Sequence, residues 1–405
     1  MAKPKIRFKG YTDDWEQRKL GDVLISLQNN TFSRADLSNE SGVAKNVHYG
    51  DVLIKFGEVL DVSKEQLPMI LDESVLTKYK ASFLQNGDVI VADTAEDSTV
   101  GKCSEIAGLN DEVILSGLHT IPYRPAEKFA TGYLGYYLNS CAYHNQLIPL
   151  MQGIKVTSIS KSAMQDTDIV YPKLMEEQTE IGNYFYALDH LITLHQRKCE
   201  ETKKLKKYML QKMFPQNGQT VPEIRFSGFT DAWEQRKLGE IATETYGGGT
   251  PKTSNEEFWK GDIPWIQSSD LIDECLFDVR PRKCISQEAV SKSATKLVPQ
   301  NSIAIVTRVG VGKLAFMPFS YATSQDFLSL SGLKIDPEFT VYALYKMMQS
   351  VSNEVQGTSI KGVTKDELLA KKIIFPSCNE QKKIGAYLHN LDHLITLHQQ
   401  KNIYF

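Results

Sequence analysis

Residues that could perform acid–base chemistry occur twice in this chain with the same spacing. Asp189 and His195 recur as Asp392 and His398. A carboxylate near a histidine can act as a general acid–base pair. Both histidines, however, fall on the apolar stripe of a predicted helix. This position favours packing between helices, or against a partner, over catalysis.

Two glycine-containing motifs approach nucleotide-binding sequences without completing them. Residues 308–313, Arg-Val-Gly-Val-Gly-Lys, lack the first glycine of a Walker loop and the hydroxyl residue after its lysine, so they cannot hold a nucleotide and its magnesium ion in the usual way. A basic turn that contacts a phosphate backbone and a plain hairpin remain equally open interpretations. Residues 247–251, Gly-Gly-Gly-Thr-Pro, are explained as well by a flexible turn.

Motifs for catalysis are otherwise missing from the sequence. It contains no N-P-P-Y or D-P-P-Y for a flipped adenine, no G-x-G-x-x-G after a strand and no H-E-x-x-H. The six cysteines form no C-x-x-C pair, which favours reduced thiols over a disulfide framework or a zinc site. We therefore expect no catalytic residue, metal or cofactor in this chain.

Composition sets the class of protein. With 405 residues, 41% apolar and 23% charged, the chain has room for two or three domains with real cores. No stretch reaches the roughly 18 apolar residues of a membrane span, and we expect a cytoplasmic protein. The net charge of −3 counts against an extended nucleic-acid surface, unless basic groups are gathered locally or a partner supplies them.

Long sequence repeats indicate how the chain is organised. Residues 5–23 return almost unchanged at 223–241, and residues 177–198 return at 380–401, an offset of 203. The segments between the repeated blocks look unrelated over most of their length. The chain therefore consists of two copies of one unit, in which a fixed frame carries a variable insert.

The second repeated block predicts two long helices. Apolar residues recur in alternating steps of four and three, which is a heptad pattern. We expect helices at 176–212 and 380–404, antiparallel and packed on each other, with a Leu188/Ile192 layer and a Leu391/Ile395 layer between them. The residues predicted at this helix–helix or partner interface are Ile181, Phe185, Leu188, Ile192, His195, Ile384, Leu388, Leu391, Ile395 and His398.

The inserts predict a mixture of strands and short helices. Strands are expected at 51–54, 88–91, 303–306 and 372–375, and a helix at 340–349. Each insert should end in a loop, one short helix and a strand, which Thr364 and Glu367 support by their capping-box spacing. The predicted divisions are a frame segment with its insert at 1–175 (insert 24–172), a central helix at 176–213, a linker at 214–222, a second frame segment with its insert at 223–379 (insert 242–376) and a distal helix at 380–405.

The repeated blocks, with residues 247–271, closely resemble the specificity subunit of bacterial type I restriction-modification systems. The resemblance covers both frames and the second insert, whereas residues 24–153 match mainly by position. It implies an α+β fold in which two mixed α/β target-recognition domains are separated by two long antiparallel conserved helices, a coiled coil, with an internal pseudo-two-fold repeat. It also implies that each domain reads one half of a bipartite site on double-stranded DNA.

The same resemblance implies a non-catalytic subunit of a larger enzyme. The helices would set the spacer between the half-sites and dock two methyltransferase subunits, which use S-adenosylmethionine to methylate adenine at N6. Motor-nuclease (restriction) subunits would use ATP and Mg²⁺. The second predicted helix is shorter than the first, and residues 203–212 have no counterpart within the chain.

Candidate DNA contacts are polar side chains in turn-rich segments beside predicted strands, because such loops can present donors and acceptors to base edges and phosphates. They are Thr250, Lys252, Ser268, Ser269, Arg308, Lys313, Ser324, Gln325 and Lys361 in the second insert, and Arg34, Asn46, His48, Lys55, Lys102, Lys155 and Ser158 in the first.

Two other classes of protein remain possible on pattern alone. A two-domain scaffold that does not bind DNA would use the heptads as an interaction rod. A self-sufficient DNA methyltransferase would need its own cofactor loop and adenine pocket, and the sequence shows neither motif.

Overall fold

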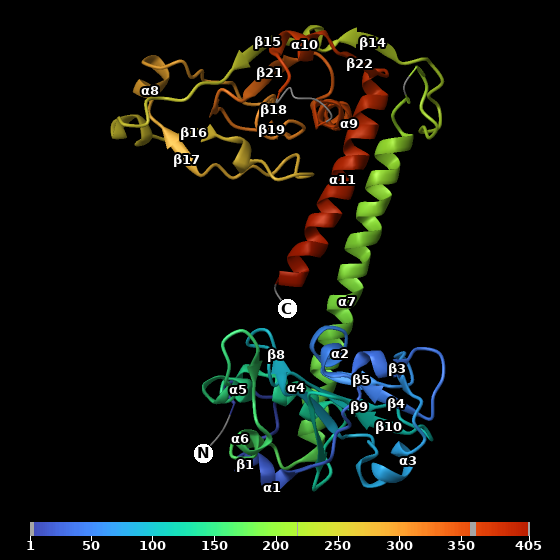
Figure 1. The fold of residues 1–405 in the computed structure, drawn as a ribbon. Helices are drawn as coiled ribbons and strands as arrows, with labels where there is room; N and C mark the ends of the chain where they lie inside the picture. Colours follow the sequence, from blue (N-terminus) through green and yellow to red (C-terminus); the bar gives the residue numbers. More distant parts are fainter. Residues whose placement is uncertain (1–3, 217, 357–361, 404–405) are drawn as a thin grey trace. The chain divides into compact units, whose positions relative to one another are not determined.

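The computed structural model describes residues 4–216, 218–356 and 362–403, and its chain forms two compact units, residues 1–191 and 192–405 (Figure 1). Unit 1 and unit 2 each combine β-sheets with helices around their own apolar clusters. The α+β class implied by the resemblance is confirmed.

Unit 1 contains two main sheets. One has the order β2 (Leu24–Ser26), β11 (Thr120–Pro125), β7 (Val89–Ala92), β9 (Cys103–Ala107) and β5 (Val59–Asp61); the other has the order β10 (Ile114–Ser116), β4 (Ala44–Val47), β6 (Met69–Ile70) and β3 (Leu37–Ser38). The strand β7 is buried along its whole length, as its Val-Ile-Val-Ala sequence favours. Smaller elements are α1 (Leu20–Val23), η1 (Arg34–Asp36), α2 (Tyr49–Ile54), α3 (Val75–Lys78), η2 (Lys80–Ser82), β8 (Thr94–Ala95), α4 (Tyr133–Asn139), α5 (Cys141–His144), η3 (Ile148–Leu150), β12 (Thr157–Ser158) and α6 (Lys161–Gln165).

Unit 2 repeats this plan. One sheet has the order β15 (Ala242–Gly247), β21 (Phe327–Leu333), β18 (Ser302–Val306) and β19 (Leu314–Met317); the other has the order β17 (Lys283–Ile285), β16 (Ile263–Ile266) and β20 (Ala322–Thr323). The remaining elements of the insert are η4 (Leu238–Glu240), η5 (Glu256–Trp259), η6 (Ser268–Asp270), α8 (Gln287–Ser291), α9 (Pro337–Gln356) and α10 (Lys365–Ala370).

The two inserts share a topology although their sequences look unrelated. In both units a central strand pairs antiparallel with two neighbours, β7 with β9 and β11, and β18 with β19 and β21. In both, the second sheet contains one parallel pair, β4 with β10 and β16 with β20. The internal repeat therefore extends through the inserts.

Most of the strands and helices predicted for the inserts are present in the structure, and one is not. The strands expected at 88–91, 303–306 and 372–375 are confirmed within a residue, and the helix expected at 340–349 is the middle of α9. The strand expected at 51–54 is wrong, because these residues form the end of helix α2. His48 accepts a hydrogen bond from Gly50 N at its N-terminus, and this cap favours the helix over an extended segment.

The first repeated block forms a strand that holds the end of each insert. β1 (Glu16–Lys19) pairs antiparallel with β13 (Asp168–Tyr171), and β14 (Glu234–Lys237) pairs in the same register with β22 (Lys372–Phe375). In both units the chain passes from a short helix through this closing strand into a long helix, as predicted. These helices are α7 (Met175–Lys212) and α11 (Cys378–Ile403).

Each long helix is clamped to its own unit by the same buried ion pair. Glu177 accepts two hydrogen bonds from the Arg7 guanidinium at 2.6 and 2.8 Å. Glu380 accepts two from Arg225 at 2.7 and 2.8 Å. Both carboxylates are almost fully buried, and bidentate pairing satisfies their charge there.

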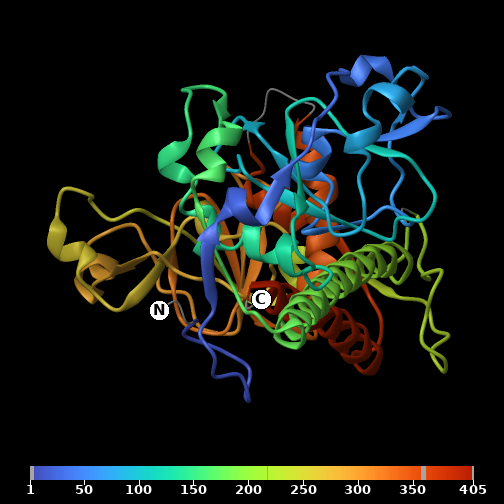
Figure 2. The same ribbon diagram turned by 90° about the horizontal axis from the view of Figure 1, so that it is seen from below.

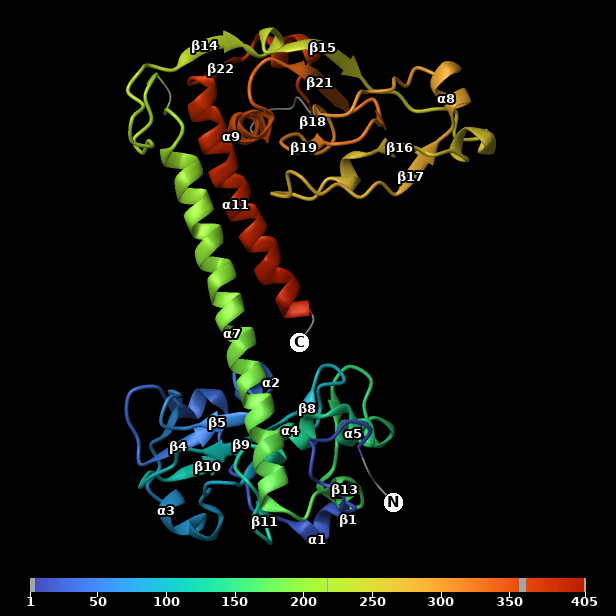
Figure 3. The same ribbon diagram turned by 180° about the vertical axis from the view of Figure 1, so that it is seen from behind.

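Within unit 2, α11 runs antiparallel to the second part of α7, and the two helices lie side by side in the views of Figures 1, 2 and 3. The rings of His195 and His398 meet with their Nδ1 atoms 3.1 Å apart. Cys199 Sγ lies 3.9 Å from the carbonyl oxygen of Ile395. The helices begin one and two residues before the predicted starts, and residue 404 lies outside the described residues. The antiparallel direction is as predicted, and both histidines lie at the contact between the helices.

The predicted seam changes partner along each helix, which corrects the expectation of one continuous interface. Ile181 packs against the unit 1 core, and Phe185 is 43% exposed. Ile384, Leu388 and Leu391 are buried in the unit 2 core. Each helix therefore uses the first part of its stripe to hold its own domain, because the strongest apolar surface nearby is the sheet and helix of that domain.

The two predicted layers are also displaced. Leu188 and Ile192 are half-buried, whereas Leu391 belongs to the unit 2 core. The neighbour of Ile395 on α7 is Cys199, seven residues beyond Ile192. Heptad spacing identified the stripe correctly, but the register between two helices depends on contacts that spacing does not contain.

Candidate nucleic-acid interface

In unit 1, five loops meet at one edge of the sheets, where β2, β4, β7 and β10 end. We call this set loop edge 1, consisting of residues 27–33, 48–56, 93–102, 117–119 and 152–158. Backbone hydrogen bonds join the loops: Gly117 N donates to Val47 O at 2.9 Å, Asp93 N to His119 O at 3.1 Å and Ile159 N to Asp93 O at 2.9 Å. These loops therefore form one connected surface.

Unit 2 has an equivalent set, loop edge 2, consisting of residues 248–255, 267–275, 307–313, 324–326 and 362–363. The same three bonds recur. Ser324 N donates to Ile266 O at 3.0 Å, Thr307 N to Asp326 O at 2.7 Å and Val363 N to Thr307 O at 2.8 Å. A common backbone scaffold thus presents different side chains at the two loop edges.

Arg308 stands at the start of the hairpin between β18 and β19. It is exposed, and no hydrogen bond or ion pair of its guanidinium occurs within the described ranges. Gly310 and Gly312 adopt φ values of 89° and 110°, which side chains rarely tolerate. The glycines of this motif are thus required by a tight hairpin, and the hairpin carries a cation able to bind a phosphate or a guanine.

Thr250 and Gln325 lie together on loop edge 2. The hydroxyl of Thr250 donates to Gln325 Oε1 at 2.6 Å, and both residues are exposed. This bond fixes the amide, whose nitrogen can still donate outward. A fixed amide suits recognition of a base edge, since amide side chains pair with adenine through two hydrogen bonds.

Three other residues predicted to contact DNA also lie on loop edge 2. Lys252 and Ser269 are exposed, and Ser268 is half-buried. Lys361 lies outside the described residues. The structure therefore brings together Thr250, Gln325 and Arg308, with Lys252 and the two serines on neighbouring loops.

Several residues predicted to contact DNA are instead buried or hydrogen-bonded within their own unit, and for these the prediction is wrong. Asn46 is fully buried and accepts a hydrogen bond from Asn30 Nδ2 at 2.6 Å, so it does not reach the surface. Ser324 is 5% exposed. The ammonium of Lys102 donates to the carbonyl oxygens of Leu53 and Phe56 at 2.9 and 3.1 Å.

Two further predicted basic contacts also have partners within the fold. Lys313 donates to Leu271 O at 3.1 Å, which matches the role of Lys102 in the other unit. Lys55 donates to Gln66 O at 3.0 Å. These lysines hold neighbouring loops in place, because a charged donor that bridges backbone carbonyls stabilises a turn.

Loop edge 1 contains a histidine whose chemistry is set by its surroundings. Partial burial, followed by the nearby Arg34 guanidinium, lowers the pKa of His48. Arg34 also pairs with Asp51 at 2.5 Å. Because a lowered pKa keeps His48 neutral near pH 7, its Nδ1 can accept the hydrogen bond that caps α2. His48 and Arg34, both predicted to contact DNA, therefore have structural roles within unit 1.

Other polar groups on loop edge 1 were missed from sequence. Gln28 and Asn29 line an open cavity of about 530 Å³. His119 is exposed, with a φ of 56°, at the turn between β10 and β11. The run of amide side chains at residues 28–30, near the start of the insert, could have indicated these groups from the sequence. The predicted contacts Lys155 and Ser158 are exposed on this edge, and Ser158 pairs with Thr94 through β12 and β8.

In the described part of the chain, no three histidine, cysteine, aspartate or glutamate side chains gather as a metal site requires. None of the described helices combines the length and apolar character needed to cross a membrane.

Comparison with known proteins gives a consistent match. A specificity subunit named for the type I restriction enzyme MjaIX of Methanocaldococcus jannaschii is 31% identical over 42% of this chain and 40% of that protein. The putative MjaX specificity subunit of the same organism is 23% identical over 96% of this chain and 89% of its own length. The EcoR124I/EcoR124II specificity subunit of Escherichia coli is 34% identical over 40% of this chain and 41% of that protein.

Solved structures agree in fold. The S subunit of a type I restriction-modification system from M. genitalium has a TM-score of 0.59 at 13% identity, covering 100% of this chain and 96% of that one. A chain from a structure of type I R-M complex assembly has a TM-score of 0.54 at 19% identity, covering 97% and 94%. The family model of the type I restriction modification DNA specificity domain matches residues 12–204 and again 230–403. These two matches cover nearly the whole chain, which therefore belongs to the type I restriction modification DNA specificity family.

Proposed function

We propose that this chain is the DNA specificity subunit of a type I restriction-modification complex, and that each unit reads one half of a bipartite site with its loop edge. The observation that carries the proposal is the recurrence of one hydrogen-bonded loop scaffold with different side chains. His119 and Asp326 occupy the same scaffold position, as do Asp93 and Thr307. A constant scaffold with variable side chains suits recognition of two different sequences.

The chemistry of the loop edges supports base recognition. Base edges are read by hydrogen-bonding side chains held on rigid elements, while phosphates take cations. Loop edge 2 offers an oriented amide at Gln325 and, at Arg308, a cation that has no partner among the described residues, both beside buried strands. With a net charge of −3 for the chain, such local cations must supply the attraction, together with basic surfaces of partner subunits.

The long helices are proposed to bind the partners and to set the distance between the half-sites. Leu194, Leu394 and Leu397 are 37–42% exposed along α7 and α11. Exposed leucines repeated along a helix favour docking of other helices. The proposed partners are two methyltransferase subunits, which would carry S-adenosylmethionine, and motor-nuclease subunits, which would use ATP and Mg²⁺. In this arrangement the methylation and cleavage chemistry lies in those subunits.

The test is methylome sequencing of cells that carry the methyltransferase subunits with or without this chain. We expect a split methylated sequence whose appearance requires the chain. The double variant Thr250→Ala, Gln325→Ala should alter one half of that sequence only. Gln235→Ala, an exposed amide change on β14 outside the loop edges, should leave it unchanged. A change in both halves would contradict independent reading.

A further inference from the structure

Equivalent residues of the repeated frame differ in burial between the two units. Phe185 of α7 is 43% exposed, whereas its counterpart Leu388 of α11 is fully buried. Trp15 is half-buried, whereas its counterpart Trp233 is 3% exposed. The frames are similar in sequence, and the elements that cover them differ between the two units.

In unit 2 the cover is formed by α9, whose Phe339 packs on Trp233, and by the end of α7. Residues 203–214 lie against α11 and the frame, with Met213 and Phe214 buried in the same core as Leu388 and Trp233. The Phe214 ring meets that of Trp233 edge-on at 5.9 Å. The segment from 214 onward, predicted as a linker, therefore begins with a core residue.

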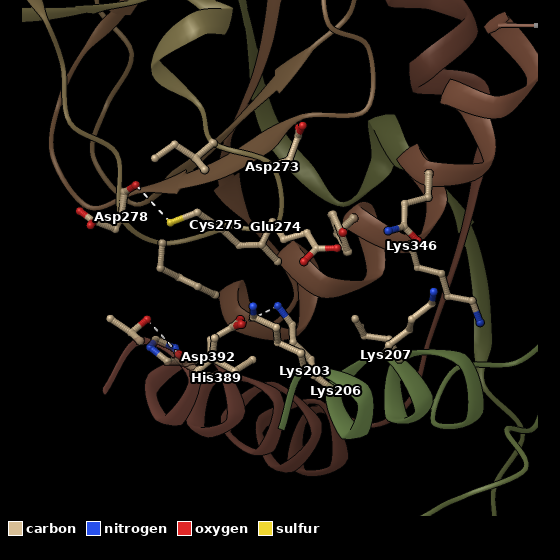
Figure 4. Close-up of a pocket in the computed structure, with 18 of the residues that line it drawn as sticks. Lys203, Lys206, Lys207, Asp273, Glu274, Cys275, Asp278, Lys346, His389 and Asp392 are labelled. Carbon is tan, nitrogen blue, oxygen red and sulfur yellow. Dashed lines mark hydrogen bonds and ion pairs between the residues drawn. The ribbon is translucent and has the colours of Figure 1, made fainter. Parts of the chain in front are cut away.

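A buried ion pair fixes this helical tail. Lys206, with 8% of its side chain exposed, donates to Asp392 Oδ1 at 2.5 Å. The other carboxylate oxygen accepts a hydrogen bond from Tyr342 of α9 at 2.6 Å. Figure 4 shows Lys203, Lys206 and Lys207 following one another along the tail, with Asp392 facing Lys206 from α11. The tail is thus a basic, amphipathic helix that fits an acidic, aromatic face.

Unit 1 has an equivalent face, on which α4 takes the place of α9 and no described residues take the place of the α7 tail. Tyr136 of α4 donates to Asp189 Oδ2 at 2.7 Å, as Tyr342 does to Asp392. Asp189 is exposed, and within the described ranges no lysine or arginine pairs with it. The Oδ1 atom of Asp189 is therefore equivalent to the Asp392 Oδ1 atom that accepts a hydrogen bond from Lys206 in unit 2.

We propose that this uncovered face, made of Trp15, Phe185, Leu188 and Asp189, binds a basic amphipathic helix of a partner protein. That helix would place one lysine on Asp189 and, eight residues later, an aromatic side chain beside Trp15. The spacing follows Lys206 and Phe214, which cover the equivalent face in unit 2. The neighbouring Tyr184 and Tyr186, 51% and 58% exposed, extend the apolar surface on offer. The inference does not depend on DNA recognition.

The test uses a labelled synthetic peptide of residues 200–216 as the probe and the full chain as receptor. Fluorescence anisotropy should show saturable binding at one site. Asp189→Asn keeps the acceptor for Tyr136 but loses the charge, and it should weaken binding about tenfold, the usual effect of a lost charge-assisted contact. Glu176→Gln removes a charge from an exposed position of the same helix and should change nothing.

A matched peptide completes the experiment. Lys206→Gln in the peptide should weaken binding to the unaltered chain but should cause no further loss with Asp189→Asn, because the two changes remove one contact. Circular dichroism confirms that the variants are folded. Absent binding, or equal binding by Asp189→Asn, would overturn the proposal. So would self-association of the chain through this face, seen as a doubled mass in light scattering that Asp189→Asn abolishes.

Discussion

Arg308 differs from most basic residues of the loop edges because its guanidinium has no task in the fold among the described residues. We expect Arg308→Ala to weaken binding of DNA by the assembled complex. If Arg308 contacts a phosphate, all sequences should lose affinity and the salt dependence should flatten by about one unit. If it contacts a guanine, one position of the site should relax at a cost of about 1–3 kcal/mol.

The measurement is binding at several salt concentrations, with specific and unrelated duplexes. Arg236→Ala is the matched control, since Arg236 is an exposed arginine on β14, outside the loop edges, and pairs with Glu234. Normal binding and methylation by Arg308→Ala at every salt concentration would remove the hairpin from the DNA surface.

Glu105 gives a prediction about pH. Burial raises the pKa of this carboxyl from 4.5 to about 7, although Gly132 N and Gly135 N donate hydrogen bonds to it. A raised pKa means that the folded state binds the proton more tightly than the unfolded state. The resulting stabilisation is fully present below about pH 4.5 and is lost as pH rises towards 7, a change of about 2–4 kcal/mol.

Thermal unfolding of unit 1 at pH 5 and pH 8 tests this. The unaltered chain should lose stability between the two values through this residue, and Glu105→Gln should show a flatter dependence. Glu105→Gln leaves one backbone donor without its acceptor, so its stability at pH 5 should be lower. An unchanged slope in the variant would show that Glu105 does not titrate in this range.

At single positions, residue type and local context identified candidate DNA contacts, but they did not predict whether each side chain lies at the surface or is buried. Arg308, Thr250 and Gln325 were predicted to be on loops and lie there. Asn46 met the same criteria, yet its strand turns it onto Asn30, sixteen residues away. Whether a polar side chain faces solvent or a distant partner depends on tertiary contacts, which local pattern does not specify.

At the scale of elements, periodicity predicted the long helices to within about two residues at each described end. It could not predict how they pack, because Lys206 lies in a lysine-rich stretch, residues 203–207, and such stretches are more often solvated than buried. Its burial against Asp392 makes that pair a test of the helix–helix contact. Lys206→Met should destabilise unit 2 by about 3–5 kcal/mol, because it leaves a mostly buried carboxylate without its cation.

A double-mutant cycle measured by urea unfolding checks this assignment. Adding Asp392→Asn to Lys206→Met should recover part of the loss, since the uncompensated charge is then gone. The matched pair Lys203→Met and Glu200→Gln, an exposed ion pair one turn away, should change stability by less than about 1 kcal/mol. Strictly additive effects at 206 and 392 would mean that the pair does not hold the helices together.

At the scale of the whole molecule, each copy of the repeat consists of a constant frame and a variable insert. Each frame clamps its insert with equivalent groups, the β1–β13 or β14–β22 pair and the arginine–glutamate pair. The inserts share strand order without visible sequence similarity. Sequence revealed the frames, because their residues recur; it could not reveal the common insert topology, because many sequences satisfy the same pattern of buried strands.

This separation predicts the outcome of transplanting one insert into the other frame. Replacing residues 242–376 by residues 24–172 joins the first insert to the second frame at equivalent points. Tyr136 should then donate to Asp392, as Tyr342 does in the unaltered chain. Under the proposal that each loop edge reads its own half-site, the methylated sequence should contain the same bases in both halves. The reciprocal transplant, residues 242–376 in place of 24–172, should give the other base sequence in both halves. Methylome sequencing distinguishes these outcomes from a site that keeps its original second half, which would mean that the frame, rather than the insert, contains the specificity.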